Sequence, residues 1–215
     1  MSPRTLRRPF PHARPARGPA PLALAVYGAV TLITLGLAYA LGRSPLATDP
    51  WHGSLEPGGP TAHAISIGAG IALAAATILA TRKLVRRWSW ARALHHDLRP
   101  SIDGAGDATL LLLGIASAVA EELFFRGLLA PVVGLVVSAV AFGALHRLRG
   151  RAGLVWGAWA TLMGLLFGSI FLATGSLFGA IVAHATINVA NLRFLRDAEV
   201  EPPAPRRLGG LLGRT

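Results

Sequence analysis

Charged side chains are scarce in this chain of 215 residues, of which they make up 14%. Soluble domains carry about 25% charged residues, so the shortfall indicates a membrane protein. Cysteine is absent, which excludes a disulfide, a thiolate nucleophile and a cysteine-ligated metal site. Lysine occurs once, at Lys83, among 21 basic residues. Such a preference for arginine is typical of GC-rich bacterial genomes, and we expect a bacterial origin.

In place of charge the chain has long apolar runs. Six are recognisable, at Pro21–Gly42, Ala62–Thr81, Ala108–Ala120, Val132–Leu145, Ala152–Thr174 and Ser176–Leu192. Spanning the hydrocarbon takes roughly 20 apolar residues. The first, second and fifth runs reach this length, the third does so only with residues 121–130, the fourth is short and the sixth is borderline. The sequence therefore predicts an all-α, polytopic membrane protein with a bundle of about six transmembrane helices.

The basic residues alternate between the two sides of the predicted bundle. Residues 1–20, the loop 82–107, the loop after His146 and the tail 196–215 are rich in arginine, whereas the loop 43–61 and the turns near Gly134 and Gly175 carry one arginine or none. By the positive-inside rule both termini are cytoplasmic, in a bacterial plasma (inner) membrane. A net charge of +11 would suggest nucleic acid in a soluble protein. Here it favours membrane lipid as the partner, and no nucleic acid.

Four segments follow from this pattern. Residues 1–20 form a disordered basic cytoplasmic arm, 21–106 two transmembrane helices with an amphipathic cytoplasmic loop, 107–195 a four-helix core, and 196–215 a cytoplasmic tail. In the loop, Leu84, Trp88, Trp90 and Leu94 stand among basic residues. Two interpretations of it remain open: a helix at the membrane interface, or a solvated linker.

Few ionisable side chains lie inside the apolar segments, away from their ends: Glu121, Glu122, Arg126, His146 and His184, with Asn188 as a polar companion. An ionisable residue inside a span costs about 2.5–3.5 kcal/mol on insertion scales and is a functional-site hypothesis by default. The alternative for any one of them is a structural ion pair or a hydrogen-bonded histidine.

Helix geometry predicts that these side chains share one depth. With the arginine-free turn near Gly134 as the outer surface, Glu121 and His146 both lie roughly 18–20 Å below it at 1.5 Å per residue. His184 and Asn188 lie roughly 13–20 Å beyond the next outer turn by the same rise. Three helices thus place polar groups at a similar level, which indicates a single site.

Spacing along the helices suggests separate roles. Glu122 and Arg126 are four residues apart, the arrangement of an ion pair on one helix face. Glu121 lies about 100° round the helix and is left free to act on water. His184 and Asn188 share one face of the last helix. Because there is no cysteine and no well-placed serine, water is the expected nucleophile of a hydrolytic site.

Three short motifs resemble those of one protein family. "EELFFR" (Glu121–Arg126) resembles the EExxxR motif of the CAAX protease and bacteriocin-processing family, also called Abi, of intramembrane proteases. "FGALH" (Phe142–His146) is similar to its FxxxH motif, and "HATIN" (His184–Asn188) to its HxxxN motif. The order matches over about 70 residues. The link between the first two motifs, "GLLAPVVGLVVS", is compact and uncharged, which predicts a tight hairpin.

The resemblance implies an intramembrane endopeptidase acting on a peptide or membrane-protein substrate. In the family the first glutamate activates water beside the FxxxH histidine, which carries over to Glu121 and His146. His184 and Asn188 would orient the water or stabilise the oxyanion. Glu122, Arg126 and Phe142 would support them.

The resemblance leaves metal dependence open. Many relatives are called metalloproteases, and Glu121, His146 and His184 could hold Zn²⁺ with an open position for water. No HExxH motif is present, and catalysis by glutamate without a metal has been argued for the fold.

Two other functions stay open as alternatives. One is a catalytically silent immunity or scaffold protein that binds a bacteriocin or a transmembrane segment. The other is a proton-coupled transporter with Glu121 as carrier, which is weaker because no inverted repeat is visible.

Overall fold

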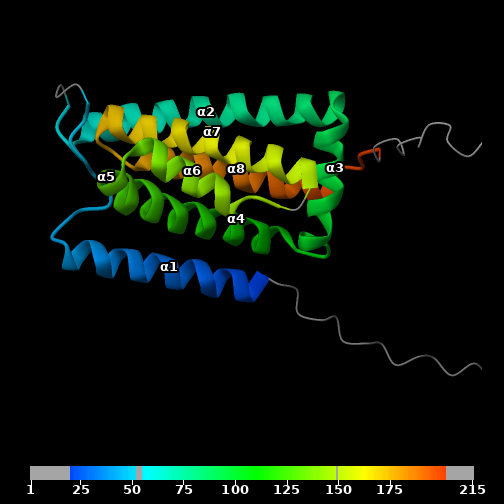
Figure 1. Cartoon of the computed structure of the whole chain (residues 1–215), viewed down its shortest axis with the longest axis horizontal. Helices are drawn as coiled ribbons and strands as arrows, with labels where there is room; N and C mark the ends of the chain where they lie inside the picture. Colours follow the sequence, from blue (N-terminus) through cyan, green and yellow to red (C-terminus); the bar gives the residue numbers. More distant parts are fainter. Residues whose placement is uncertain (1–19, 52–54, 149, 202–215) are drawn as a thin grey trace, which may run out of the picture.

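The computed structural model describes residues 20–51, 55–148 and 150–201 (Figure 1). These residues form α1 (Ala20–Ala40), α2 (Pro60–Arg87), α3 (Ser89–Leu98), η1 (Arg99–Ile102), α4 (Asp107–Glu122), η2 (Leu123–Leu129), α5 (Ala130–Val133), α6 (Leu135–Leu145), α7 (Gly150–Thr174) and α8 (Phe178–Asp197). The described part of the chain has no strand beyond an isolated bridge between Ala47 and Ser176. The predicted arm, except Ala20, and most of the predicted tail lie outside the described residues.

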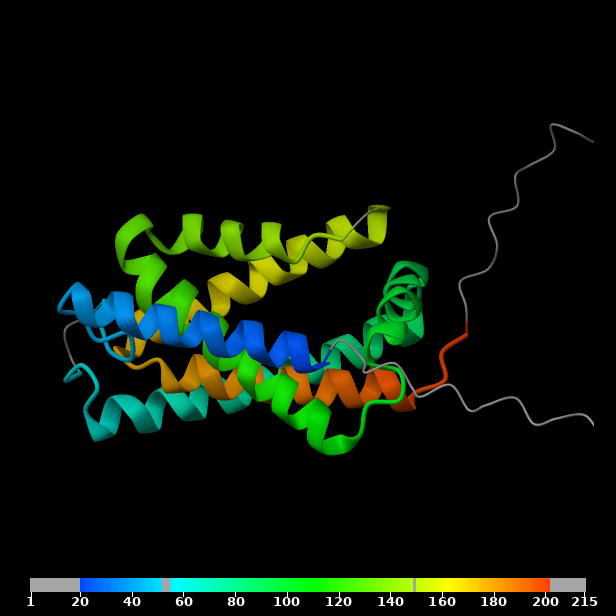
Figure 2. The ribbon, with the colours of Figure 1, turned by 90° about the horizontal axis from the view of Figure 1, so that it is seen from below.

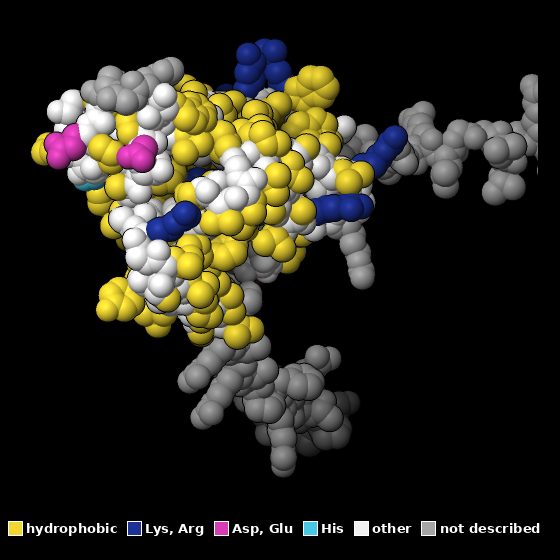
Figure 3. Space-filling view, turned by 60° about the vertical axis from the view of Figure 1, so that its left-hand side comes forward, with side chains coloured by type: hydrophobic (Ala, Val, Ile, Leu, Met, Phe, Trp, Pro, Cys, Tyr) yellow, Lys and Arg dark blue, Asp and Glu magenta, His cyan; other side chains and the backbone are white. Residues whose placement is uncertain are grey.

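Five helical segments among the described residues are long and apolar enough to cross a membrane: Ala20–Ala40, Pro60–Arg87, Asp107–Val133, Gly150–Thr174 and Phe178–Asp197. The third segment joins α4, η2 and α5. As the sequence predicts, the third apolar run reaches membrane length only with residues 121–130 included. A sixth apolar helix, α6, is shorter. Hydrophobic side chains cover most of the face seen in Figure 3. The predicted all-α, polytopic membrane architecture is confirmed.

Helix α8 is the centre of the bundle, and it packs against α2, α4 and α7. Its contact with α2 is unusually close, since a Cβ atom added at Gly70 would lie 2.2 Å from the carbonyl oxygen of Gly179. A Cβ added at Gly179 would lie 2.0 Å from the carbonyl oxygen of Ser66. Small residues at a helix interface let two backbones approach in this way. This contact fixes α8, which carries two of the predicted site residues.

The segment that follows the two glutamates is a π-helix, η2. Within it the backbone N–H of Ala130 donates to the carbonyl of Phe125, five residues earlier. The Ser138 hydroxyl on α6 donates to the same carbonyl at 2.6 Å. Single π turns inside α-helices often occur at functional sites. Here the π turn begins directly after Glu122.

The chain reverses direction at Gly134, and the helix that follows, α6, is short. Gly134, between α5 and α6, has φ +87°, a conformation that residues with a side chain rarely adopt. This single residue makes the tight hairpin that the sequence predicts. Helix α6 has 11 residues, and its length is therefore about 16 Å, roughly half the hydrocarbon thickness. His146 consequently lies deep in the bundle rather than at its surface.

The two ends of the bundle differ in charge. Both described termini, Ala20 and Glu201, lie at one end (Figure 1). We call it the basic end, because it carries Arg82, Lys83, Arg86, Arg87, Arg92, Arg99, Arg147, Arg151, Arg193 and Arg196. The opposite end includes residues 41–51 and 55–59 and the turns at Gly134 and Gly175, with two exposed acids, Asp49 and Glu56, and one exposed arginine, Arg43.

Helix α3 lies across the basic end, nearly perpendicular to the long helices (Figure 1). It is the segment that the sequence marks as amphipathic. Its residues Ala91, Leu94 and His95 are buried, and α3 packs against α2 and α7. Figure 2 shows α6 and the start of α7 diverging from α1 and α4 toward this same end.

Candidate active site

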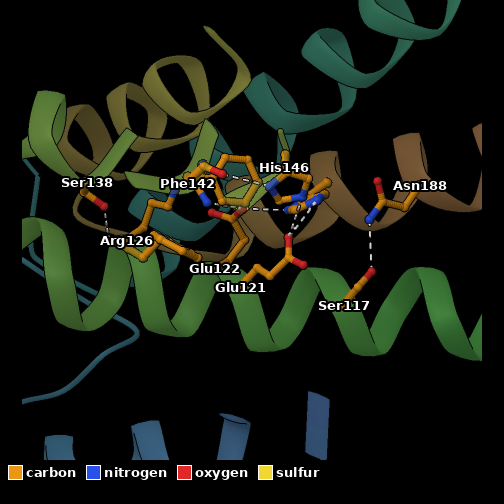
Figure 4. A network of polar contacts seen from close by, with 10 residues as sticks. Ser117, Glu121, Glu122, Arg126, Ser138, Phe142, His146 and Asn188 are labelled. Carbon is orange, nitrogen blue, oxygen red and sulfur yellow. Dashed lines mark hydrogen bonds and ion pairs between the residues drawn. The ribbon is translucent and has the colours of Figure 1, made fainter. Parts of the chain in front are cut away.

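Three helices bring Glu121, His146 and His184 together. Glu121 lies in the last turn of α4, and His146 directly follows α6 (Figure 4). His184 lies on α8. The Oε2 atom of Glu121 is 3.8 Å from Nε2 of His146 and 3.7 Å from Nε2 of His184. The three side chains that helix depth assigns to one level are therefore neighbours.

The second nitrogen of each histidine ring is already engaged. Nδ1 of His146 lies 2.8 Å from the carbonyl oxygen of Phe142, and Nδ1 of His184 lies 2.7 Å from Oε1 of Glu122. Both of these oxygens are acceptors, so Nδ1 carries the hydrogen in each ring. In a neutral imidazole the other nitrogen, Nε2, then presents a lone pair. Both Nε2 atoms do so toward Glu121.

The oxygen between the two rings has no hydrogen-bond donor. Oε2 of Glu121 is buried and has no hydrogen-bond partner among the described residues. Together with the two Nε2 atoms it makes three acceptors that converge on one place. A water molecule is the smallest group that could donate to two of them at once.

Glu122 and Arg126 form the ion pair that their spacing predicts. Nη1 of Arg126 lies 2.9 Å from Oε1 of Glu122, with side-chain exposures of 1% and 0%. The guanidinium also lies over the Phe142 ring, 4.3 Å from its centroid. The same Glu122 oxygen accepts from His184, so this carboxylate joins α4 to α8. That contact depends on how α8 sits against α4, which motif spacing does not encode.

Asn188 lies one helical turn beyond His184, and its partner is a residue that sequence reasoning missed. Its Nδ2 atom donates to the Ser117 hydroxyl at 3.0 Å. Ser117 lies one turn before Glu121 on α4 (Figure 4). Ser117 and Asn188 therefore form a second polar contact between α4 and α8, one turn nearer the basic end than the contact of His184 with the glutamates. The four-residue spacing of Ser117 and Glu121 was the available signal.

Aromatic rings enclose the histidines. His184 stacks on Phe167 with ring centroids 5.0 Å apart and an interplanar angle of 21°. Phe142 is 2% exposed, and its ring centroid is 4.3 Å from that of His146. Phe167 stands in an apolar run of α7 with nothing in the sequence to distinguish it. The rings restrict both imidazoles to the orientation that faces Glu121.

A cavity of about 460 Å³ connects this site to the basic end. Glu121, His146, His184 and Asn188 line it, and so do residues of α1, α2, α3 and α7. The side chains of Glu121 and His146 are 17% and 26% exposed, so a molecule in the cavity can reach them. Glu122, which is fully buried, does not line it.

Glu121, His146 and His184 resemble a metal site in the type of their donor groups but not in their arrangement. The chemistry of the donor set, one carboxylate and two imidazoles, is of the kind that holds zinc. As the described residues are arranged, however, no group of three or more His, Cys, Asp or Glu side chains could hold a metal ion.

The comparison with family models gives one match. Residues 108–190 match the family described as "Type II CAAX prenyl endopeptidase Rce1-like". This segment, which carries all three motifs, is similar to the Rce1-like domain of the CAAX protease family. The match begins at the second residue of α4 and covers Glu121, His146, His184 and Asn188. Comparison with curated proteins and with solved structures gives no match.

The match confirms the resemblance seen in the three motifs. At the level of the family, the Rce1-like domain is that of an intramembrane protease in an integral membrane protein. Helices α1, α2 and α3 lie before the matched segment, yet they contribute to the walls of the cavity.

The buried ion pair predicts a strong effect of removing one partner only. Arg126→Met leaves the charge of Glu122 buried without its cation, and we expect a loss of about 3–5 kcal/mol in the free energy of unfolding. The double variant Glu122→Gln/Arg126→Met has no uncompensated charge and should recover most of this loss. Unfolding of the purified proteins in mild detergent would measure both, with Arg151→Met, an exposed arginine, as control. A double variant as unstable as the single one would contradict this account.

Proposed function

We propose that the protein is an intramembrane endopeptidase that hydrolyses a peptide bond of a membrane-associated peptide or protein with water as the nucleophile. The observation that carries this proposal is the convergence of three acceptor atoms, from Glu121, His146 and His184, at the inner end of the cavity. A water molecule there donates one hydrogen to Oε2 of Glu121 and the other to a histidine Nε2. Its lone pairs are then directed toward a substrate in the cavity.

Bond formation begins with proton transfer to Glu121. As the water oxygen attacks the carbonyl carbon of the scissile bond, Glu121 takes one of its protons as general base. The imidazole of His146 accepts from the same water and fixes its orientation, because its other nitrogen is held by the carbonyl of Phe142. The carbonyl oxygen of the substrate becomes a tetrahedral oxyanion.

The oxyanion requires a hydrogen-bond donor, and Asn188 supplies one. Its amide donates one hydrogen to Ser117, which leaves the second N–H for the cavity that Asn188 lines. Preorganised donors of this kind stabilise the charge that develops in acyl transfer. The carbon–nitrogen bond then breaks, the amine leaving group takes the proton held by Glu121, and an acid and an amine are released.

Glu122 and Arg126 act on this reaction through His184. The Glu122 carboxylate holds the ring by its Nδ1 hydrogen, and Arg126 balances the charge of that carboxylate. Histidines in reactive sites are commonly oriented by a carboxylate in this way. The largely apolar cavity limits bulk water, so the few polar contacts of the site are stronger than they would be in solvent.

The orientation of the protein in the membrane is a further part of the proposal: the basic end faces the cytoplasm of a bacterial cell. The support is that, apart from the buried Arg126, the arginines and the single lysine of the long helices gather at this end, together with both described termini. Cytoplasmic segments of membrane proteins carry this excess of positive charge.

Replacing the general base should abolish proteolysis without unfolding the protein. For Glu121→Gln, which keeps the size of the side chain, we expect a loss of roughly 10²–10⁴-fold in cleavage rate. Quantitative proteomics of new protein termini in membranes that contain either the wild-type chain or the variant would identify the substrates and measure the effect. Glu56→Gln, an exposed glutamate at the opposite end, is the matched control.

Two outcomes of that experiment would count against the mechanism. New termini that persist in Glu121→Gln would show that another residue activates water. If wild type, control and variant all produce no new termini while the protein still binds a membrane partner, the silent immunity or scaffold function is favoured.

Metal removal tests the proposed nucleophile. Because the proposed water is activated by a carboxylate and imidazoles alone, 1,10-phenanthroline or EDTA should leave the cleavage rate unchanged within about twofold. The purified protein would be treated with chelator and assayed on a substrate found by the proteomic comparison. Inactivation by chelator that is reversed by added Zn²⁺ would replace this mechanism with a metal-dependent one.

Reporter fusions test the orientation. A phosphatase that is active only outside the cytoplasm should be inactive when fused after Glu201 and active when inserted at Gly134, at the opposite end. A fluorescent protein that folds only in the cytoplasm should give the reverse pattern. The opposite result with both reporters would invert the proposed topology.

A further inference from the structure

The cavity has a second polar end, formed by Arg82 in α2. Arg82 lines the cavity near the basic end. Its Nη1 atom donates to Oδ1 of Asn191 at 2.8 Å and its Nη2 atom to the carbonyl of Ala190 at 2.8 Å. The guanidinium also stacks on Phe194, 3.9 Å from the ring centroid. Contacts on α8 thus hold the guanidinium in one place.

The positive charge of Arg82 is not balanced by the protein. Within the described residues no carboxylate lies at ion-pair distance from it, whereas Arg126 has Glu122 and Arg196 has Asp107. A guanidinium has five N–H donors, and the contacts to Asn191 and Ala190, with a longer one from Nη1 to the Thr81 hydroxyl at 3.5 Å, use three of them. Arg82 therefore keeps donors available for a group in the cavity.

The wall next to Arg82 includes a buried histidine, His95 on α3, which is 4% exposed and whose Nε2 atom has no hydrogen-bond partner among the described residues. Burial lowers the pKa of His95, and the nearby charges of Arg99 and Arg82 act in the same direction, against a hydrogen bond to the backbone of Ala198. Arg82 is the one arginine among the described lining residues. A negatively charged group bound here would balance its charge.

The two polar ends of the cavity are separated by about two turns of α8. Asn191, the partner of Arg82, follows His184 by seven residues, which is roughly 10 Å along the helix. Between these ends the cavity wall includes apolar side chains of α4, α7 and α8, such as Leu113, Met163 and Ile187. Among the described lining residues Glu121 is the only carboxylate, and it lies at the other end. The cavity thus matches an apolar chain with a negative charge at one end.

We propose that Arg82, positioned by Asn191 and Phe194, is a specificity-determining residue that binds the carboxylate of a substrate whose apolar part lies in the cavity beside α8. Arginine suits this task because its planar guanidinium matches a carboxylate with two parallel hydrogen bonds. The inference rests on the proposed function for its reaction, although binding itself requires no turnover. The carboxylate could be the C-terminus of a peptide or the head of a fatty acid.

The competing role for Arg82 is a purely structural one, a clamp between α2 and α8. The two roles differ in a measurable way. Loss of a clamp weakens every ligand of the cavity alike, whereas loss of a carboxylate-binding residue weakens only ligands that carry the charge. The test therefore compares matched probes with and without the carboxylate.

Binding can be followed through the tryptophans of the cavity. Trp90, Trp156 and Trp159 line it, so a dansyl group bound there accepts energy from them. The full chain in nanodiscs of phosphatidylcholine at pH 8 would be titrated with 11-(dansylamino)undecanoic acid and with its primary amide. A second pair would be a dansylated apolar tetrapeptide with a free C-terminus and the same peptide as its C-terminal amide.

We expect wild type to bind the acid form of at least one pair roughly tenfold or more tightly than the amide, the gain typical of a hydrogen bond to a charged group. Arg82→Gln should abolish the difference, and Arg82→Lys should retain most of it. Arg86→Gln, an exposed arginine one turn further along α2, should leave it unchanged. Discrimination by the peptide pair alone identifies a peptide C-terminus, and discrimination by both pairs identifies any apolar carboxylate.

Two results would overturn the proposal: equal binding of acid and amide by wild type in both pairs, or an equal loss of acid and amide binding in Arg82→Gln. The second would assign Arg82 to the clamp. Glu121→Gln separates this proposal from the proposed function. If that variant still discriminates acid from amide while wild type yields no new termini in membranes, the proteolytic function fails and the carboxylate site stands.

Discussion

The arrangement of the site depends on one buried oxygen, Oε1 of Glu122, which accepts from both Arg126 and His184. A fully buried carboxylate is costly unless cations and hydrogen bonds surround it. Here its two partners come from its own helix and from α8. The Glu122 carboxylate, stabilised by Arg126, thereby holds the imidazole of His184 on α8 beside Glu121. This network separates the neighbouring glutamates of one motif into a fully buried one, Glu122, and one that the cavity reaches, Glu121.

The early end of α6 gives the site its access. A helix of full length would carry residue 146 to the membrane surface, but α6 ends after 11 residues and leaves His146 deep in the bundle. The space beyond it is part of the cavity that reaches α3 and Arg82. The apolar interior of the bundle is therefore reached from the basic end through this cavity. The segment that matches the Rce1-like model carries Glu121, His146 and His184, and α1 to α3 complete the walls of the cavity.

The fold class and the grouping of the site residues could be predicted because they depend on periodicity and length. A rise of 1.5 Å per residue is enough to place Glu121 and His146 at one depth. The contacts of Glu122 with His184 and of Asn188 with Ser117 could not be predicted, because they depend on the rotation of α8 against α4. That rotation is set by packing on two sides of α8, at Gly179 against Gly70 of α2 and at Val189 against Gly114 of α4. Arg82 was counted only as a charge that orients the protein, since its contacts with α8 are equally long-range.

The length of the link between the first two motifs is part of the site. Compared with an α-helix, a π turn accommodates one extra residue. This extra residue is contained within η2, so the helical turns on its two sides keep their facing. In the regular helix α6, by contrast, a deletion of one residue between Leu135 and Ala141 would turn everything after it by about 100°. The motifs would be intact, yet His146 would no longer face Glu121. A stretch of plain leucines, valines and alanines therefore has little tolerance for a change of length in α6, although most of its individual side chains could be exchanged.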